Sequence, residues 1–224
     1  MKKKKRKKLR VKNLFKFLLI ILIVLLIGYL VMLLKVKTFY VDGNKYLTDE
    51  EILKELKLNN NSPFIFTNNI FEKNIIKKSN FIKSVSLSKN FDLEIFITVE
   101  EYRMLFVDQN DNKIVLENEK RIDYTDINLP VLVNKIDNKS IYSSFVKKMS
   151  KVDDNTLTMI SEINYSPNGI DKERFIFSMN DGNYVYVTLT KLKKINEYRS
   201  IIDSVENKKG ILYLDYGNYF VPKE

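Results

Sequence analysis

Residues 36–58 read VKTFYVDGNKYLTDEEILKELKL, and this stretch decides the fold of the first folded domain. Its opening residues, 36–41, are rich in side chains that favour strands. Asp42-Gly43-Asn44 then predicts a turn in which Gly43 takes a positive φ. Thr48 and Glu51 match a T-x-x-E capping box, which marks the beginning of a helix. The stretch therefore predicts a strand, a turn and a capped amphipathic helix.

Further along the chain, the pattern predicts a second helix and two more strands. Asn69 and Glu72 form a second capping pair before an apolar face that extends to Ile76. Residues 84–88 and 93–100 alternate apolar and polar side chains, which is typical of half-buried strands. The order strand, helix, helix, strand, strand predicts a small α+β domain in which two helices cover a three-stranded sheet.

Towards the N-terminus, residues 17–34 read FLLIILIVLLIGYLVMLL and carry no charge. As a helix this segment is about 27 Å long, close to the roughly 30 Å hydrocarbon core of a bilayer. A buried helix of a soluble domain would keep a polar stripe, and this segment has none. It is also longer than the apolar part of a signal peptide, and no A-x-A-like site follows it. We interpret it as an uncleaved transmembrane anchor.

A strongly basic tail, residues 1–16, precedes the anchor. Ten of its sixteen residues are Lys or Arg and none is acidic. Without these ten, Lys and Arg equal Asp and Glu in number, so the balanced remainder gives no support for a nucleic-acid-binding face. An excess of Lys and Arg on one side of a span predicts that this side is cytoplasmic. The rest of the chain is then extracytoplasmic, and it has no Cys, so it folds without disulfides.

The basic tail, the anchor and the sequence after them resemble the FtsQ and DivIB family of cell-division proteins. The family's polypeptide-transport-associated (POTRA) domain has an aromatic-x-V-x-G-N pattern, matched here by Phe39, Val41, Gly43 and Asn44. The family's E-R-x-P stretch reads E-Y-R-M at residues 101–104, without the proline. The resemblance implies a POTRA-like domain over residues 35–103 and a second domain over residues 104–224.

The second domain is expected to be a mainly antiparallel sheet with helices on one face. Strands are expected at 105–107, 114–116, around Ile163, 175–179 and 184–189, and helices at 141–149 and 192–202. The turn at 180–183, Asn-Asp-Gly-Asn, predicts a hairpin. The stretch around Pro130 is interpreted as an exposed segment or an edge strand. The final ILYLDYGNYF, residues 211–220, resembles the family's terminal strand.

No catalytic chemistry is predicted. The chain lacks His and Cys, which excludes Ser-His-Asp and Cys-His catalysis and ordinary zinc sites. Its six glycines are scattered rather than grouped into a phosphate-binding loop. The acidic pairs Glu100-Glu101 and Asp153-Asp154 are interpreted as solvated surface residues. We expect no enzyme activity, no cofactor and no metal, and no nucleic-acid or small-molecule ligand.

The candidate partner-binding residues gather near the end of the chain. Tyrosines of a strand either pack on a sheet or bind a partner, and both readings stay open at this point. A strand at a sheet edge offers unpaired backbone groups that a partner strand can meet. The proposed set is Tyr184, Tyr186, Leu212, Tyr213, Leu214, Tyr216, Tyr219 and Phe220. Gly43, Asn44, Thr48 and Glu51 are assigned structural roles in the turn and the helix cap.

The resemblance implies a non-enzymatic scaffold at the division septum. It would dock FtsB/DivIC-like and FtsL-like proteins on its extracytoplasmic face and help to regulate septal peptidoglycan synthesis. A second, weaker contact is expected at strand 93–100 of the POTRA-like domain. The alternatives are a secretion or envelope-assembly component, since such domains occur there too, and a cell-wall enzyme, which the missing catalytic residues disfavour.

Overall fold

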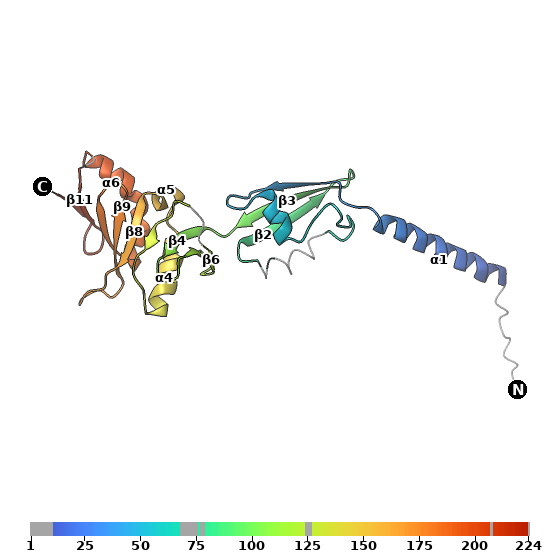
Figure 1. The fold of residues 1–224 in the computed structure, drawn as a ribbon, viewed down its shortest axis with the longest axis horizontal. Coiled ribbons are helices and arrows are strands. Elements are labelled where there is room, and N and C mark those ends of the chain that lie inside the picture. The colour runs from blue at the N-terminus through green and yellow to red at the C-terminus, as the bar shows by residue number, and fades with distance from the viewer. Residues whose placement is uncertain (1–10, 68–75, 77–78, 124–126, 207, 224) are drawn as a thin grey trace, which may run out of the picture. The chain divides into compact units, whose positions relative to one another are not determined.

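The computed structural model describes residues 11–223 apart from 68–75, 77–78, 124–126 and 207, and the chain folds as two compact units (Figure 1). The units are Met1–Glu101 and Tyr102–Glu224. The first contains α1 (Val11–Met32), in which Leu14–Met32 is long and apolar enough to cross a membrane. The helix ends two residues before the end of the predicted span at residue 34. The tail before residue 11 lies outside the described residues.

The first unit also contains a three-stranded sheet packed against a short helix. Its elements are β1 (Thr38–Asp42), α2 (Asp49–Glu55), β2 (Ile82–Lys89) and β3 (Glu94–Glu101). The strand order is β1-β3-β2, with β1 parallel and β2 antiparallel to β3. Alternate side chains of β3 face a core that includes Ile52, Leu56, Ile95, Ile97 and Val99. Most of the second predicted helix, with Asn69 and Glu72, lies outside the described residues.

The local signals around β1 and α2 appear in the structure as hydrogen bonds and close packing. The Glu51 backbone donates to the Thr48 hydroxyl over 3.3 Å, and the Thr48 backbone donates to the Glu51 carboxylate over 2.8 Å, so both halves of the capping box form. Gly43 has φ of +87°, and a Cβ at this position would lie 2.3 Å from the Val99 carbonyl oxygen. Only glycine satisfies both the turn and this close approach.

Glu101 corrects the interpretation of the acidic pair at residues 100–101. Glu100 is exposed and pairs with Lys83 over 2.7 Å, as a surface residue would. Glu101 is only 8% exposed and accepts three backbone N–H bonds from the loop at residues 45–47, at 3.1, 2.8 and 3.1 Å. In a strand, successive side chains point to opposite faces, so one carboxylate is solvated and its neighbour closes a loop.

The central position of β3 limits how the expected second contact could be made. β3 is paired with β1 on one side and β2 on the other. A partner strand is therefore not expected to pair with β3 between Glu94 and Thr98, and a contact through the exposed side chains of this strand stays a prediction. The strands at the two edges of this sheet are β1 and β2.

The second unit contains nine strands, three α-helices and a 3₁₀ helix within its described residues. Its elements, in chain order, are β4 (Met104–Asp108), β5 (Lys113–Leu116), β6 (Arg121–Asp123), β7 (Val131–Leu132), α4 (Lys139–Met149), α5 (Asp154–Leu157), β8 (Ile160–Tyr165), β9 (Arg174–Met179), β10 (Tyr184–Thr188), η1 (Leu189–Glu197), α6 (Tyr198–Ser204), β11 (Gly210–Tyr213) and β12 (Tyr219–Pro222).

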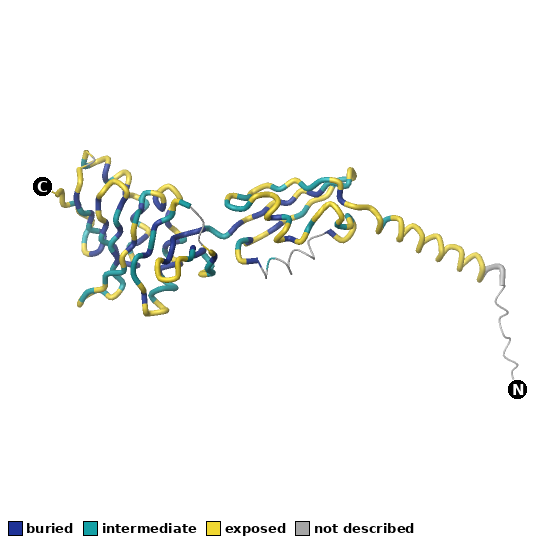
Figure 2. Tube along the Cα trace, viewed as in Figure 1, coloured by how far each residue is buried: buried dark blue, intermediate teal, exposed yellow. Residues whose placement is uncertain are grey.

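These nine strands form one mixed sheet in the order β12-β11-β10-β9-β8-β7-β4-β5-β6. Five neighbouring pairs are antiparallel and three are parallel, so the sheet is mainly antiparallel. The helices pack on the face that carries Val185 and Val187, and the buried segments gather in the strands beneath them (Figure 2). Phe145 of α4 stacks on Phe175 of β9 with ring centroids 4.6 Å apart.

Two sequence-based assignments in this unit were wrong. The stretch around Pro130 is not an edge strand, because β7 lies between β4 and β8 and pairs with both in parallel. Pro130 comes just before β7, where its missing N–H costs nothing, and its carbonyl accepts a hydrogen bond from Val107. The terminal stretch forms two strands, β11 and β12, rather than one, because the chain turns back between Tyr213 and Tyr219.

Candidate functional site

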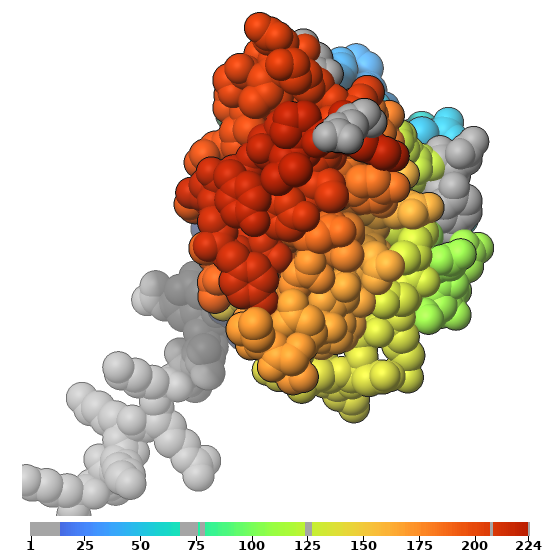
Figure 3. All heavy atoms as spheres, turned by 90° about the vertical axis from the view of Figure 1, so that its left-hand side faces the viewer, coloured from blue at the N-terminus to red at the C-terminus, as the bar shows by residue number. Residues whose placement is uncertain are grey.

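The candidate site is the sheet edge formed by β12. This strand is the outermost of the nine and pairs only with β11, antiparallel, with Leu212 opposite Phe220 and Tyr213 opposite Tyr219. The space-filling view shows this terminal segment, in red, on the outer surface of the unit (Figure 3). Within the part of the chain that the structure describes, the side of β12 away from β11 therefore has no neighbouring strand.

The register fixes which backbone groups of β12 face outward. The Lys223 N–H bonds the Lys209 carbonyl over 2.8 Å, which makes these two residues a hydrogen-bonded pair. Hydrogen-bonded pairs alternate along an antiparallel ladder, so Val221 and Tyr219 also bond to β11. Phe220, between them, points its N–H and C=O away from β11. Pro222 also faces outward, where its lack of an N–H leaves the ladder intact.

Two rows of side chains cross the open face of the sheet and end at β12. In the first row, Tyr186 meets Tyr213 edge to face with ring centroids 5.1 Å apart, and Tyr213 stacks on Tyr219 at 4.8 Å. The second row follows the register from Tyr184 to Ile211 to Val221. Tyr184, Tyr219 and Val221 are all about half exposed. The rows form an apolar and aromatic surface next to unpaired backbone groups.

An ion pair between Arg174 and Asp215 supports the first row next to Tyr186, at the end of the row away from β12. The Arg174 guanidinium lies over the Tyr186 ring, 4.5 Å from its centroid, and its Nε donates to Asp215 over 3.0 Å. The Asp215 side chain is 1% exposed, and the Lys191 ammonium bonds the Asp215 carbonyl over 2.7 Å. Because Asp215 lies two residues after the end of β11, these contacts hold the turn before β12 against the body of the sheet.

The start of β11 is fixed by a hydrogen-bonded cluster around Asn183. Its side-chain Oδ1 accepts from the Gly210 N–H over 2.7 Å, and its side-chain Nδ2 donates to the Tyr198 hydroxyl over 2.9 Å. That hydroxyl donates to Asp181 over 2.7 Å. Burial, strengthened by Asp181, raises the pKa of Tyr198 above its ordinary range. Burial opposes the charge on Asp181, yet hydrogen bonds from Tyr198 and Asn183 outweigh it and lower its pKa.

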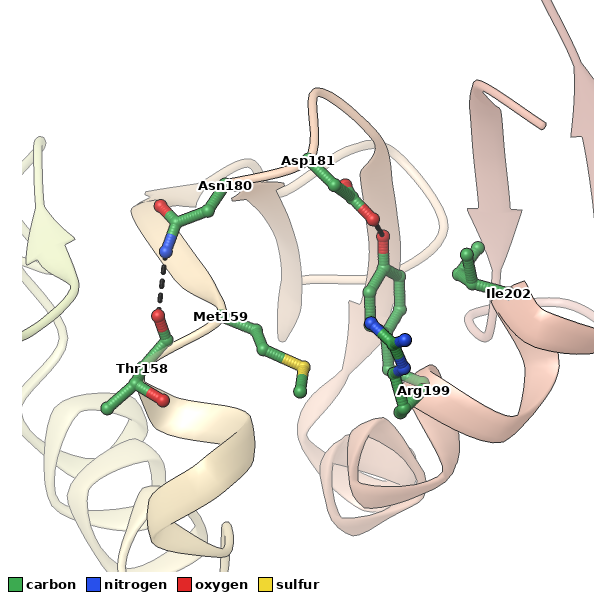
Figure 4. Close-up of a pocket in the computed structure, with 7 residues that line it drawn as sticks. Thr158, Met159, Asn180, Asp181, Arg199 and Ile202 are labelled. Atoms are coloured by element: carbon green, nitrogen blue, oxygen red, sulfur yellow. Dashed lines mark hydrogen bonds between the residues drawn. The ribbon is translucent and has the colours of Figure 1, made fainter. Parts of the chain in front are cut away.

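A cavity of about 140 Å³ opens beside this cluster (Figure 4). Asp181 and Tyr198 meet on one side of it, and Asn180 donates to the Thr158 carbonyl over 2.7 Å on the other. The polar groups at its wall already bond to one another, and the space holds only a few water molecules. We assign it no ligand.

A charged groove of about 610 Å³ lies near the opposite edge strand, β6. There Arg121 bonds Asp108 over 2.9 Å, Asp111 over 2.5 Å and the Tyr142 hydroxyl over 2.7 Å. Burial is the largest influence on Tyr142 and raises its pKa to about 12. These charges satisfy one another, and among the described residues no cluster of acidic side chains could hold a metal ion.

The structure separates the eight candidate partner residues into three groups. Tyr184, Tyr186, Tyr213 and Tyr219 belong to the two rows on the open face. Tyr216 is exposed in the turn and its hydroxyl accepts from Asn168 over 3.2 Å, while Phe220 packs partly against the core. Leu212 and Leu214 are each 1% exposed and belong to the core, so their place in a surface site was wrong. They alternate with Tyr213 and point to the opposite face.

Four contributors to the edge were missed in the sequence. Ile211 and Val221 complete the second row, and Arg174 with Asp215 supports the first. The alternation of Ile211 with Leu212 was a usable signal for the rows. No local pattern marks the ion pair, because its partners are 41 residues apart.

The apolar helix and the small α+β domain after it define a class of protein. The chain has one helix long and apolar enough for a membrane span within its described residues, followed by β1 and the first sheet. The family model of the POTRA domain, FtsQ-type, matches residues 34–102. The chain is therefore a POTRA-domain protein with an N-terminal apolar helix, a combination that fits a single-pass membrane protein.

Relatives with known names narrow the class to a family. Cell division protein DivIB of Listeria monocytogenes is 30% identical, and the alignment covers 96% of this chain and 84% of the relative. DivIB of Bacillus subtilis is also 30% identical, over 83% of this chain and 73% of the relative. The chain belongs to the DivIB family of cell division proteins.

A solved structure of a DivIB domain is similar to part of the chain. The major extracytoplasmic domain of DivIB from Geobacillus stearothermophilus aligns over 48% of this chain and 97% of its own, with 22% identity and a TM-score of 0.39.

Proposed function

We propose that the chain is a non-enzymatic docking platform of the division machinery. In this proposal α1 anchors the protein in the cell membrane and the basic tail stays in the cytoplasm. The two sheet domains that follow α1 work outside, at the septum. The second unit captures FtsB/DivIC-like and FtsL-like proteins and so helps to regulate septal peptidoglycan synthesis. Membership of the DivIB family supports the role in division.

The observation that carries the proposal is the open edge at β12. Its outward backbone groups at Phe220 can accept a partner strand, and the rows ending at Tyr219 and Val221 supply an adjoining apolar surface. Main-chain bonds would then give affinity and side-chain contacts would give specificity. Tyrosine suits such a surface because it buries a large ring at a low cost in side-chain entropy.

The test separates the backbone bond from the side chain at one position. Full-length protein in detergent is immobilised and titrated with the purified exterior part of an FtsB/DivIC-like partner from the same organism. Phe220→Ala and Phe220→Pro both lose the phenyl ring, and only Phe220→Pro also loses the outward backbone N–H. Loss of one net hydrogen bond is expected to weaken binding by roughly three- to tenfold in Phe220→Pro relative to Phe220→Ala.

The two variants also separate the possible failures. Equal binding by both, with wild-type binding intact, would place the partner elsewhere on the molecule. Absence of binding by folded wild-type protein would count against the docking role itself. Val221→Pro serves as a structural control, because its N–H bonds to β11 and its loss should lower stability.

A further inference from the structure

The first unit exposes apolar side chains on two neighbouring loops. Phe91, in the turn between β2 and β3, is fully exposed. Ile65 and Phe66, in the loop after Pro63, are 44% and 45% exposed. Lys89 joins the two loops, because its ammonium bonds the carbonyls of Phe64 and Ile65 and lies 4.7 Å from the Phe64 ring centroid. We call Ile65, Phe66 and Phe91 the apolar tip.

Hydrogen bonds tie both loops to the chain just after α1. The Phe64 N–H bonds the Leu34 carbonyl over 2.9 Å, and the Lys37 N–H bonds the Leu93 carbonyl over 2.9 Å. β1 and β3 are parallel with Thr38 opposite Glu94, so the turn that carries Phe91 lies beside the start of β1 (Figure 1). The apolar tip therefore lies at the end of the sheet where the chain arrives from the helix.

Chain length limits how far the tip can move from the helix end. Leu34 follows Met32, the last residue of α1, by two residues, which span at most about 8 Å. Lys37 follows it by five residues, which span at most about 19 Å. These limits depend only on the covalent chain and the hydrogen bonds, so they hold for any orientation of the unit relative to α1.

We propose that the apolar tip inserts into the interface of the membrane that α1 crosses, and so seats the first unit on the lipid. Aromatic and aliphatic side chains of interfacial segments sit at the boundary of headgroups and acyl chains. Lys35 and Lys37 are exposed next to the tip, and their charges suit anionic headgroups. Exposed apolar side chains within reach of the span and flanked by lysines match a lipid surface. The inference rests on α1 as the anchor, which is part of the proposed function.

Tryptophan fluorescence can test whether the apolar tip inserts into the lipid, since the chain contains no Trp. Phe91→Trp gives a single reporter at the tip, and full exposure of Phe91 makes the substitution harmless to packing. Ile170→Trp is the matched control, because Ile170 is 85% exposed in a loop of the second unit. Each full-length variant is reconstituted into vesicles of phosphatidylethanolamine and phosphatidylglycerol, with and without brominated acyl chains.

We expect the emission of Phe91→Trp to shift to shorter wavelength and to be strongly quenched by the brominated lipid. The Ile170→Trp emission should stay at the wavelength of an indole in water and be quenched little. Equal quenching of the two reporters would overturn the seat. A shifted but unquenched Phe91→Trp emission would overturn it too, because protein rather than lipid would then cover the tip.

Alkali extraction of the same vesicles separates this inference from the proposed anchor. If the protein stays with the lipid and the Phe91→Trp reporter is unquenched, insertion of the apolar tip is refuted while α1 remains the anchor. If the protein is extracted, α1 fails as an anchor and the seat fails with it.

Discussion

Glu101 and Arg103 stand two positions apart, and each closes a loop within its own unit. Glu101 accepts three backbone N–H bonds in the first unit. In the second, Arg103 donates to the carbonyls of Ser150 and Val152, both over 2.8 Å, and pairs with Asp154. Charged side chains that bond several backbone groups make strong, geometrically specific contacts. At the scale of single residues, these two fix the ends of the units on each side of Tyr102.

Replacing Glu101 by Gln tests this role. The amide keeps one acceptor, but its NH₂ group meets a backbone N–H donor that the carboxylate satisfied. We expect the first unit to lose about 1–3 kcal/mol of unfolding free energy, the usual cost of an unsatisfied buried group. Chemical denaturation of full-length protein in detergent measures it. Glu100→Gln is the matched control, because this exposed neighbour should change stability by less than about 0.5 kcal/mol.

Tyr142 predicts a change of stability at high pH. Its folded pKa of about 12 lies above the ordinary value for tyrosine, about 10. The unfolded chain therefore loses this proton first, and stability present below pH 10 is lost as the pH rises towards about 12. We expect Tyr142→Phe to show a shallower loss than wild type in denaturation between these pH values. The exposed Tyr184→Phe is the control, and equal slopes for wild type and Tyr142→Phe would refute the assignment.

At the scale of elements, the proposed docking edge depends on a turn that is not part of it. Asn183 closes the β9–β10 hairpin and also bonds Tyr198 of α6 and Gly210 of β11. One amide thus joins three elements, and β12 is placed only through β11. The order of β12 therefore depends on the hydrogen bonds of Asn183.

Asn183→Ala is expected to loosen β11 and β12. It leaves the Gly210 N–H without its acceptor, at a cost of about 1–3 kcal/mol. Hydrogen exchange should become faster in β11 and β12, while the core strand β8 keeps its protection. Asn180→Ala is the matched control in the same turn, since its side chain bonds the Thr158 carbonyl at the surface. Equal exchange in the two variants would refute the role of Asn183.

Elements with local signals were predictable from the sequence, and those placed by distant partners were not. The capping box of Thr48 and the turn at Gly182 depend on residues a few positions apart, and the structure contains both. The interior position of β7 depends on parallel pairing with β4 and β8, which are far away in the chain. The tyrosine face was read from alternation, whereas the burial of Leu212 required knowing which face the helices cover.

At the scale of the whole molecule, charge is distributed unevenly about the apolar helix. Ten basic residues lie within residues 1–16, eight of them before α1 and two, Lys12 and Lys16, in its first two turns, and the rest of the chain is formally neutral. Positively charged segments tend to remain in the cytoplasm, so we expect this charge to orient the span with the domains after α1 outside. In the proposed topology, the signal that orients the protein precedes both sheets in the sequence.

Thiol labelling can test this orientation, because the chain has no Cys. A membrane-impermeant maleimide should label Ile170→Cys in cells without their wall, since Ile170 is 85% exposed in the second unit. It should label Lys5→Cys, in the tail, only after the membrane is permeabilised. Labelling of the tail position in sealed cells would show the opposite orientation.

The position of the edge in the sequence has a consequence for the timing of synthesis. β10 and β11 are parallel neighbours separated by η1 and α6, and β12 comes later still. Ribosomes add about 5–20 residues per second, so β10 is made before β11, the strand that will pair with its free side. The proposed docking edge exists only once Pro222 has been made and exported. Recruitment of a partner would then be restricted to molecules in which β12 has been made, and chains interrupted earlier would not compete for it.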